Sequence, residues 1–169
     1  MQQNVPDFTA LLRSAERSAV HLEMRDSYMA DPLFDAWREG RDVELPEEYR
    51  QWQELVGETT ARGVTLRRVR IVSEPVTDYI RWEHSLTARH NIAAGEIVRW
   101  LPRRLSSDLA LPGNDLWSID DERVLFHWFT GDGEWAGHEV NEDHATVKMV
   151  VASVEALWDR AIPHEEFVV

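Results

Sequence analysis

Hydrophobic positions spaced three and four residues apart predict five helical segments in this chain. The clearest runs over residues 143–161, where valine, leucine and tryptophan side chains recur on one helix face before Pro163. Another begins at Pro46 and is expected to stop at Gly63. The remaining helical ranges are 7–15, with Asp7 as the N-cap, a short helical turn at 31–37, and 75–89.

Segments rich in β-branched and aromatic residues lie between these helices and predict six strands. The strand ranges are 19–24, 64–72, 97–101, 116–120, 123–129 and 135–140. Asp132-Gly133 is typical of a hairpin turn, so the last three strands are expected to form an antiparallel meander. Strands separated by helices favour parallel pairing. The fold class is therefore predicted to be α/β, with a single mixed sheet flanked by helices.

A single domain over residues 1–169 is expected from this length. Residues 1–62 are predicted to form a mainly helical N-terminal extension, and residues 63–163 the α/β part. The chain has no cysteine, which excludes disulfides, thiolate metal sites and a cysteine nucleophile. It shows no membrane-spanning apolar run and no signal-peptide pattern at its N-terminus. We therefore expect a cytoplasmic protein that does not contact membranes.

The net charge of −13 opposes direct binding to nucleic acid. The charge is unevenly spread, because residues 64–104 carry eight arginines and four acidic residues. Alternate residues of a strand share a face, so Arg68 and Arg70 are expected to lie together, with Arg81 approaching from the next helix. These three are the predicted ligand-binding residues for a phosphate, a nucleotide, a carboxylate or an acidic partner segment. The alternative is that nearby acids neutralise them internally; those acids are Glu74, Asp78 and Glu83.

Two tryptophans, Trp128 and Trp135, flank the hairpin turn and are the predicted partner-binding surface, with burial in the core as the alternative. The hairpin is expected to bring His127 opposite His138, but no metal-binding spacing is present. No phosphate-binding loop, dinucleotide fingerprint or nucleophile elbow occurs either. The sequence therefore predicts no metal, no cofactor and no catalytic residue. It leaves open whether the chain forms homo-oligomers.

The order of elements between Gly63 and Pro163 resembles half of a phospholipase D-like domain, in particular the non-catalytic versions used as sensor domains in transcription regulators. The likeness lies in the strand Val69-Arg70-Ile71-Val72, the strand Trp117-Ser118-Ile119-Asp120 and the closing helix. Catalytic members carry a histidine, a lysine and an aspartate on the equivalent of the second strand. If Asp120 is that aspartate, the lysine position is Asp115 and the histidine position is Gly113. The resemblance thus implies a catalytically degenerate domain.

The whole chain is also similar to a family of small actinomycete proteins of unknown function. The most specific stretch is Arg70-Ile71-Val72-Ser73-Glu74-Pro75-Val76-Thr77-Asp78-Tyr79-Ile80-Arg81-Trp82-Glu83. Members of that family are commonly encoded beside helix-turn-helix (XRE-type) regulators, which implies a regulatory partnership. We therefore expect a non-enzymatic regulatory domain that binds such a regulator, with a possible ligand-sensing role. The alternative is an enzyme or binding protein for an anionic small molecule that uses the arginine-rich region.

Overall fold

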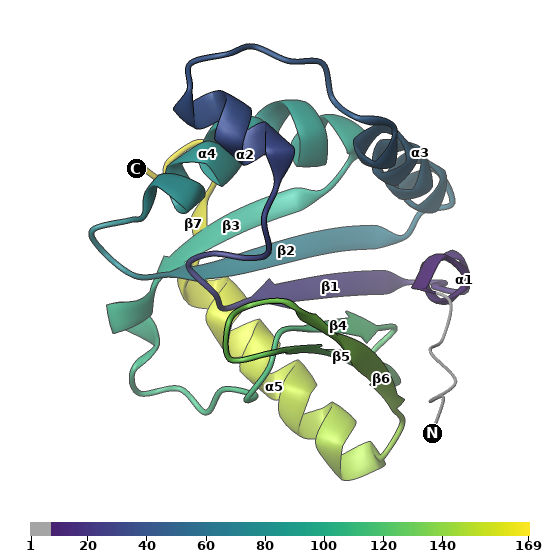
Figure 1. Cartoon of the computed structure of the whole chain (residues 1–169). Helices are drawn as coiled ribbons and strands as arrows, with labels where there is room; N and C mark the ends of the chain where they lie inside the picture. The colour runs from purple at the N-terminus through teal and green to yellow at the C-terminus, as the bar shows by residue number, and fades with distance from the viewer. Residues whose placement is uncertain (1–7) are drawn as a thin grey trace.

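The computed structural model describes residues 8–169, which form a mixed seven-stranded sheet with helices on both faces (Figure 1). The strand order is β6-β5-β4-β1-β2-β3-β7. The strands are β1 (Ser18–Glu23), β2 (Thr65–Val72), β3 (Ile97–Pro102), β4 (Leu116–Ile119), β5 (Arg123–Phe129), β6 (Trp135–Asn141) and β7 (Ile162–Pro163). The helices are α1 (Phe8–Arg13), α2 (Pro32–Arg38), α3 (Glu47–Ala61), α4 (Asp78–Thr87) and α5 (His144–Arg160). The predicted α/β fold class is confirmed.

Strand pairing follows the predicted rule. Strands β1, β2 and β3, which are separated by helices, pair in parallel, whereas β4, β5 and β6 form an antiparallel meander. In that meander His127 pairs with His138, as expected. The short strand β7 was not predicted, nor was the π-helical segment Ala88–Ile92 that extends α4. Asp7, the predicted N-cap of α1, lies outside the described residues.

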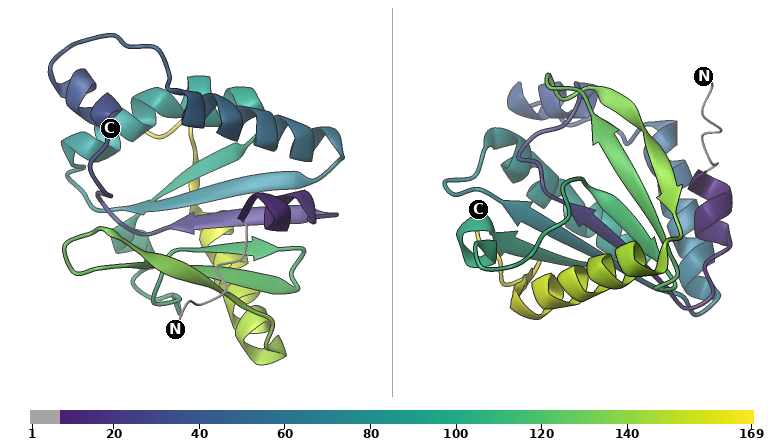
Figure 2. Two further views of the ribbon diagram at one scale, coloured as in Figure 1. Left: turned by 45° about the vertical axis from the view of Figure 1, so that its right-hand side comes forward. Right: turned by 90° about the horizontal axis from the view of Figure 1, so that it is seen from below.

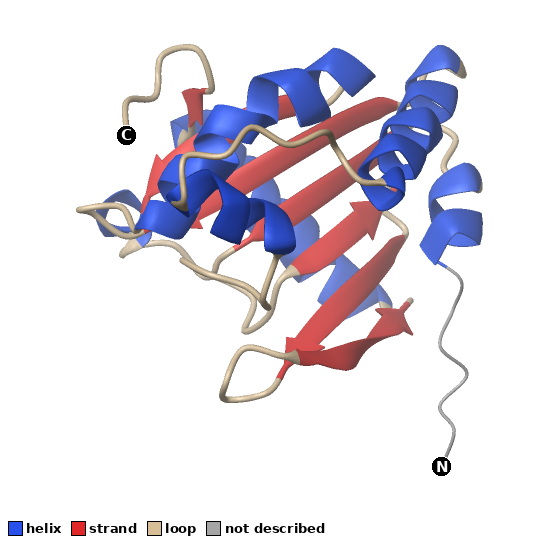
Figure 3. Ribbon diagram, turned by 45° about the horizontal axis from the view of Figure 1, so that its top comes forward, coloured by secondary structure: helices blue, strands red, loops and turns tan. Residues whose placement is uncertain are grey.

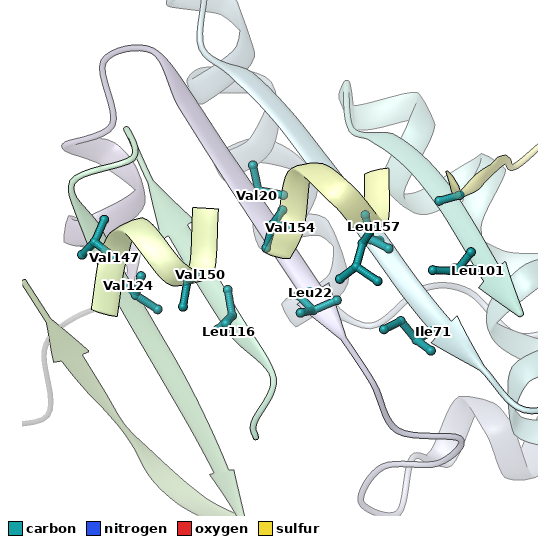
Figure 4. Packing of buried hydrophobic residues seen from close by; sticks show 12 residues of the cluster. Val20, Leu22, Ile71, Leu101, Leu116, Val124, Val147, Val150, Val154 and Leu157 are labelled. Atoms are coloured by element: carbon teal, nitrogen blue, oxygen red, sulfur yellow. The ribbon is translucent and has the colours of Figure 1, made fainter. Parts of the chain in front are cut away.

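One face of the sheet packs against α5, which crosses the strands diagonally (Figures 2 and 4), with Leu109 and Leu111 added from the segment before β4. The predicted stripe of α5, including Val147, Val150, Val154 and Leu157, is buried there against apolar strand residues. Those strand residues are Val20, Leu22, Val69, Ile71, Leu101, Leu116 and Val124. This dry layer provides most of the hydrophobic burial on that side.

Helices α2, α3 and α4 cover the opposite face (Figure 3). At the α1 and α3 end this face is apolar, with Leu12 and Val56 packed on Leu66 and Trp117. Further along β1 and β2 the same face becomes polar, because it carries charged side chains. No helix in the described part of the chain is long and apolar enough to span a bilayer.

Strand β1 corrects the expectation of an N-terminal helical extension. It lies in the middle of the sheet between β4 and β2, so residues 8–62 share the core of the remaining chain. The strand itself was predicted, at residues 19–24, but its place in the sheet depends on pairing with segments more than forty residues away. The division at residue 62 is therefore not a boundary between two structural units.

Asp120 fastens β1 to the end of β4. Its carboxylate accepts hydrogen bonds from the backbone N–H groups of Glu16, Arg17 and Ser18 at 2.7–2.9 Å. Burial acts to raise the pKa of Asp120, but these three donors outweigh it and hold the pKa below the usual value. Asp120 also adopts a left-handed backbone conformation with φ of 54° at the turn into β5. It is a structural residue that places β1 in the sheet.

Replacing Asp120 by alanine is expected to lower the free energy of unfolding by about 2–4 kcal/mol, because three donors lose a charged acceptor. Urea unfolding at neutral pH measures this. Glu122→Ala is the matched control, since Glu122 lies two residues away in an exposed ion pair with Arg17 and its loss is expected to cost under about 0.5 kcal/mol. An equal effect of the two substitutions contradicts the assigned role of Asp120.

Candidate functional site

A cavity of about 350 Å³ lies on the polar face of the sheet, where β1 and β2 face α3 and α4. Nine of its twenty lining residues are aromatic; they are Phe8, Tyr28, Tyr49, Trp52, Tyr79, Trp82, Trp117, Phe129 and Trp135. Eight more have ionisable side chains; they are His21, Glu23, Arg68, Arg70, Glu83, His90, Asp115 and His127. Met29, Leu86 and Asn91 complete the wall. We take this cavity as the candidate site.

Arg68 and Arg70 lie on the same face of β2, as predicted, and both are buried. Glu23, at the end of the neighbouring strand β1, binds both of them. Its two oxygens accept hydrogen bonds of 2.5 Å from Arg68 Nη1 and from Arg70 Nε. Burial opposes the charge of Glu23, but the two guanidinium groups outweigh it and hold its pKa well below the usual value.

Glu96 completes the neutralisation of Arg68 from beneath. It is almost fully buried and accepts hydrogen bonds from Arg68 Nε at 2.7 Å, Trp52 Nε1 at 2.9 Å and Asn91 Nδ2 at 2.8 Å. Arg70 is further held by Thr87 Oγ1 at 2.6 Å. Arg68 therefore has carboxylate partners, and Arg70 has carboxylate and hydroxyl partners, all supplied by the chain. This is the predicted alternative of internal neutralisation. Of the acids expected to provide it, Glu83 pairs with Arg70, whereas Glu23 and Glu96 take the place of Glu74 and Asp78.

Glu83 on α4 is the least satisfied carboxylate of the cavity. Its nearest cationic atom is Arg70 Nη2 at 3.7 Å, and its carboxylate accepts no hydrogen bond from any residue between 8 and 169. Burial raises the pKa of Glu83 to about 7; Arg70 opposes this rise and Glu23 adds to it. Glu83 thus holds a proton part of the time at neutral pH.

Asp115 faces the same space from the loop before β4. It accepts a hydrogen bond from the backbone N–H of Met24 at 2.9 Å and another from the hydroxyl of Tyr28. Burial raises the pKa of Asp115 to about 6 against the opposing effect of the Tyr28 hydrogen bond. Four carboxylates consequently share this region with two guanidinium groups; the carboxylates are Glu23, Glu83, Glu96 and Asp115.

Three histidines add polar ring atoms to the wall. His21 stacks on Trp117 with ring centroids 4.3 Å apart, and its Nδ1 lies 3.4 Å from Glu23 without hydrogen-bonding geometry. Burial lowers the pKa of His90 and of His127 to about 4 and that of His21 well below its usual value. All three are neutral at neutral pH, and ring nitrogens of all three lack hydrogen-bond partners within the described chain.

Arg81 does not join the cluster, which corrects that part of the prediction. The cavity-facing residues of α4 are Tyr79, Trp82, Glu83 and Leu86. Arg81 follows Tyr79 by two residues, about 200° around the helix, and so points away from the sheet. Its side chain is 40% exposed, and its Nε lies 3.8 Å from Asp78.

The two tryptophans of the hairpin do not form one surface. Trp135 is 44% exposed and contacts His127 and Phe129 at the rim of the cavity. Trp128 is half-buried and occupies the strand position next to Phe129, so its side chain lies on the other face of the hairpin.

Glu83 and His84 on α4 point in different directions, as expected, because Glu83 lines the cavity whereas His84 contacts the carbonyl of Phe167. Among residues 8–169, no cluster of three or more potential metal ligands occurs.

Sequence reasoning missed Glu23, His21 and Asp115 as site residues. The alternation over residues 19–24 places His21 and Glu23 on one face of a strand, which is the signal that was available. Their pairing with Arg68 and Arg70 depends on the register of β1 against β2, which aligns His21 with Arg68 and Glu23 with Arg70. Asp115 and Tyr28 come from loops whose positions no local pattern predicts.

The sequence profile of a family described as a domain of unknown function, DUF6879, matches residues 6–169. The chain belongs to this family. A comparison with curated proteins found no match. Among solved structures, the chain is similar to TrmBL2, an archaeal chromatin protein described as having a novel mode of DNA binding. The identity is 12% and the TM-score 0.52, with 92% of this chain and 48% of that chain covered. At this identity the likeness concerns the fold alone. The chain spans about half the length of that protein.

Arg68→Ala is expected to lower the free energy of unfolding by about 3–5 kcal/mol, because Glu23 and Glu96 would be left buried without the cation that they share. Arg81→Ala is the matched control and is expected to cost under about 0.5 kcal/mol, since Arg81 forms only an exposed contact. Chemical denaturation of both variants at neutral pH measures the difference. Similar stabilities for the two would show that the buried network is not what holds β1 against β2.

Glu83→Gln is expected to stabilise the protein at high pH. In the folded state the pKa of Glu83 is about 7 against an ordinary value of 4.5, so folding takes up a proton between these values. The wild-type protein therefore loses stability as pH rises from about 4.5 through 7, by about 3 kcal/mol or on the order of 10 °C in Tm. Glutamine cannot ionise, so the two proteins should have equal Tm near pH 4.5 and the variant the higher Tm at pH 8. A variant that is less stable at pH 8 contradicts this assignment.

Proposed function

We propose that this chain is a non-enzymatic sensor domain that binds a small molecule in the cavity beneath α3 and α4. The observation that carries the proposal is the cavity itself, which has a volume of about 350 Å³. Aromatic side chains line much of it, and histidine ring nitrogens in its wall have no hydrogen-bond partner among the described residues. Small-molecule sites have this character: they are concave, mostly apolar, and contain a few converging polar groups. Buried polar atoms without partners carry a free-energy cost that a bound ligand removes.

A binding role is supported over catalysis by the residue types of the wall. No serine, threonine, cysteine or lysine is among the described residues that line the cavity. The three histidines thus have no serine or threonine hydroxyl, thiol or lysine amine beside them to activate. The phospholipase D-like resemblance leads to the same proposal, because Gly113 and Asp115 stand where the catalytic histidine and lysine are expected. We therefore propose that the C-terminal part is a degenerate member of that fold.

We further propose that ligand binding is transmitted to a helix-turn-helix regulator. This partnership rests on the resemblance to proteins encoded beside such regulators. The net charge of −13 supports it, because an acidic protein complements a basic DNA-binding partner and is itself repelled by DNA. TrmBL2, which is described as binding DNA, has the same fold over part of its chain, and this is compatible with a role near DNA.

The alternative of an anionic ligand bound by Arg68 and Arg70 is less well supported. Both guanidinium groups are buried and bonded to Glu23, which lies between them and would repel an approaching anion. An anion would have to displace that carboxylate. We therefore favour a ligand that leaves the arginine–glutamate network in place.

The tryptophans provide the test of the sensor proposal. Protein labelled with 5-fluorotryptophan gives one ¹⁹F NMR signal for each of the eight tryptophans, assigned by single Trp→Phe variants. A library of small aromatic compounds that contains cationic, neutral and anionic members is then screened. A cavity ligand is expected to shift Trp117 and Trp135, which line the cavity, and to leave the signals of Trp128 and Trp158 unchanged as internal controls.

Leu86→Trp is the blocking variant, because Leu86 lines the cavity and a larger side chain there fills it. Compounds that bind the wild-type cavity are expected to lose their effect on Trp117 and Trp135 in this variant. If no compound of the library shifts these two signals, or if the same shifts persist in Leu86→Trp, the cavity is not a ligand site and the proposal is wrong.

A further inference from the structure

We infer that the ligand of this cavity is an organic cation, an amine whose ammonium group lies against Glu83 and whose apolar body packs on the aromatic wall. This inference rests on the proposed sensor function and specifies the ligand class. Four observations carry it: the carboxylate of Glu83, which accepts no hydrogen bond from the described residues; the excess of carboxylates over guanidinium groups; the aromatic side chains beside Glu83; and the unpartnered ring nitrogens of His90 and His127.

Glu83 is the point at which an additional cation fits. Its carboxylate lines the cavity and lacks a hydrogen bond from any described residue, whereas Glu23, Glu96 and Asp115 each accept two or more. The nearest positive group, Arg70, stands 3.7 Å away and directs its Nε to Glu23. An ammonium group has three donors and no acceptor, so it provides what this carboxylate lacks.

The local charge balance favours a cation as well. Arg68 and Arg70 are the only guanidinium groups among the described cavity-lining residues, and both are bound to Glu23. Three carboxylates line the cavity with these two cations, namely Glu23, Glu83 and Asp115, and Glu96 is a fourth that is buried behind Arg68. Burial is the main cause of the raised pKa values of Glu83 and Asp115, and the negative charge of Glu23 raises both further. A bound ammonium group would replace the proton that Glu83 holds part of the time at neutral pH.

The wall beside Glu83 suits the apolar part of an amine. Tyr79, Trp82 and Leu86 lie on the same face of α4 as Glu83, at helical spacings of three and four residues. The rings of Tyr79 and Trp82 are 5.1 Å apart, and Tyr28 lies across from Tyr79 at 6.1 Å. Aromatic faces attract a cation, and the attraction is larger where water is excluded.

Neutral histidine rings add unpartnered nitrogens to the wall, and each such ring has one N–H donor and one lone pair. His90 is only 8% exposed, and its Nδ1 has no hydrogen-bond partner in the described chain. Its lowered pKa keeps the ring neutral, so one ring nitrogen offers a lone pair. His127 likewise has two unpartnered ring nitrogens at the opposite side of the cavity. An ammonium group can donate to the lone pair of such a ring as well as to Glu83, whereas a carboxylate cannot donate to either.

The test compares ligands that differ only in their terminal group. Tryptamine, tryptophol and indole-3-acetate share an indole body and end in an ammonium, a hydroxyl and a carboxylate, and the corresponding phenyl and cyclohexyl series vary the body. Binding is measured by titration of the Trp117 and Trp135 ¹⁹F signals up to the solubility limit of each compound. At least one amine is expected to bind about tenfold or more tightly than its alcohol, with the carboxylate weakest.

Glu83→Gln is expected to reduce amine affinity about tenfold, to that of the alcohol, and to leave alcohol binding unchanged. The matched control is Asp78→Asn, an exposed acid on the same helix outside the cavity, which should alter neither. This control separates a specific site from the general attraction of cations to a chain of charge −13. Because Glu83→Gln is expected to be at least as stable as wild type at pH 8, loss of folding does not explain lost binding there.

The outcomes separate this inference from the sensor proposal. If an alcohol or a carboxylate shifts Trp117 and Trp135 as strongly as its amine, the cavity binds ligands but not through a cation, and only the present inference is wrong. If amines bind equally well to Glu83→Gln, Glu83 does not recognise them. If no amine of the three series binds while other library compounds occupy the cavity, the cation class is excluded and the sensor proposal stands.

Discussion

The bridging of Arg68 and Arg70 by Glu23 is the interaction on which the candidate site depends. Two guanidinium groups inside a protein repel each other and lose hydration, so they remain buried only because carboxylates reach both. The bridge requires β1 and β2 to pair in parallel with Glu23 beside Arg70. It also requires Asp120 to hold the start of β1 in place. The register of one strand pair thus places Glu23 beside the two arginines of the cavity.

The two faces of the sheet have different roles: one contributes mainly to stability, and the other carries the candidate site. The face under α5 is mainly apolar, and burial of these apolar side chains stabilises the fold. Its polar members Arg67 and Arg99 lie over the ring of Trp158 on α5. The opposite face carries the charged network, which adds little net stability because desolvation opposes the attraction of buried ion pairs. Glu83 illustrates the cost, since its burial raises its pKa and weakens the folded state at high pH. A site that retains such a group is pre-organised for a partner of opposite charge.

Local sequence patterns were sufficient for most of the secondary structure. The apolar stripe of α5 recurs at the period of a helix, and successive side chains of β2 alternate between the two faces of the sheet. The meander of β4 to β6 is indicated by its β-branched and aromatic segments and by the turn at Asp132-Gly133. Strand β7 has two residues and forms by pairing with the edge of β3, so it is too short to show a periodic pattern in the sequence. The central position of β1 is likewise a result of long-range pairing, which replaced the expected N-terminal extension by a shared core.

For the site, the sequence alone determined that Arg68 and Arg70 share a face, because alternate residues of a strand always do. It did not determine the direction of Arg81, since the rotation of α4 is set by the packing of Tyr79, Trp82 and Leu86 on the sheet side. Glu23 and Asp115 meet the arginines from segments 45 or more residues away. Only the tertiary structure decided that these charges share one cavity, because side chains remote in sequence are brought together by strand register and not by local spacing.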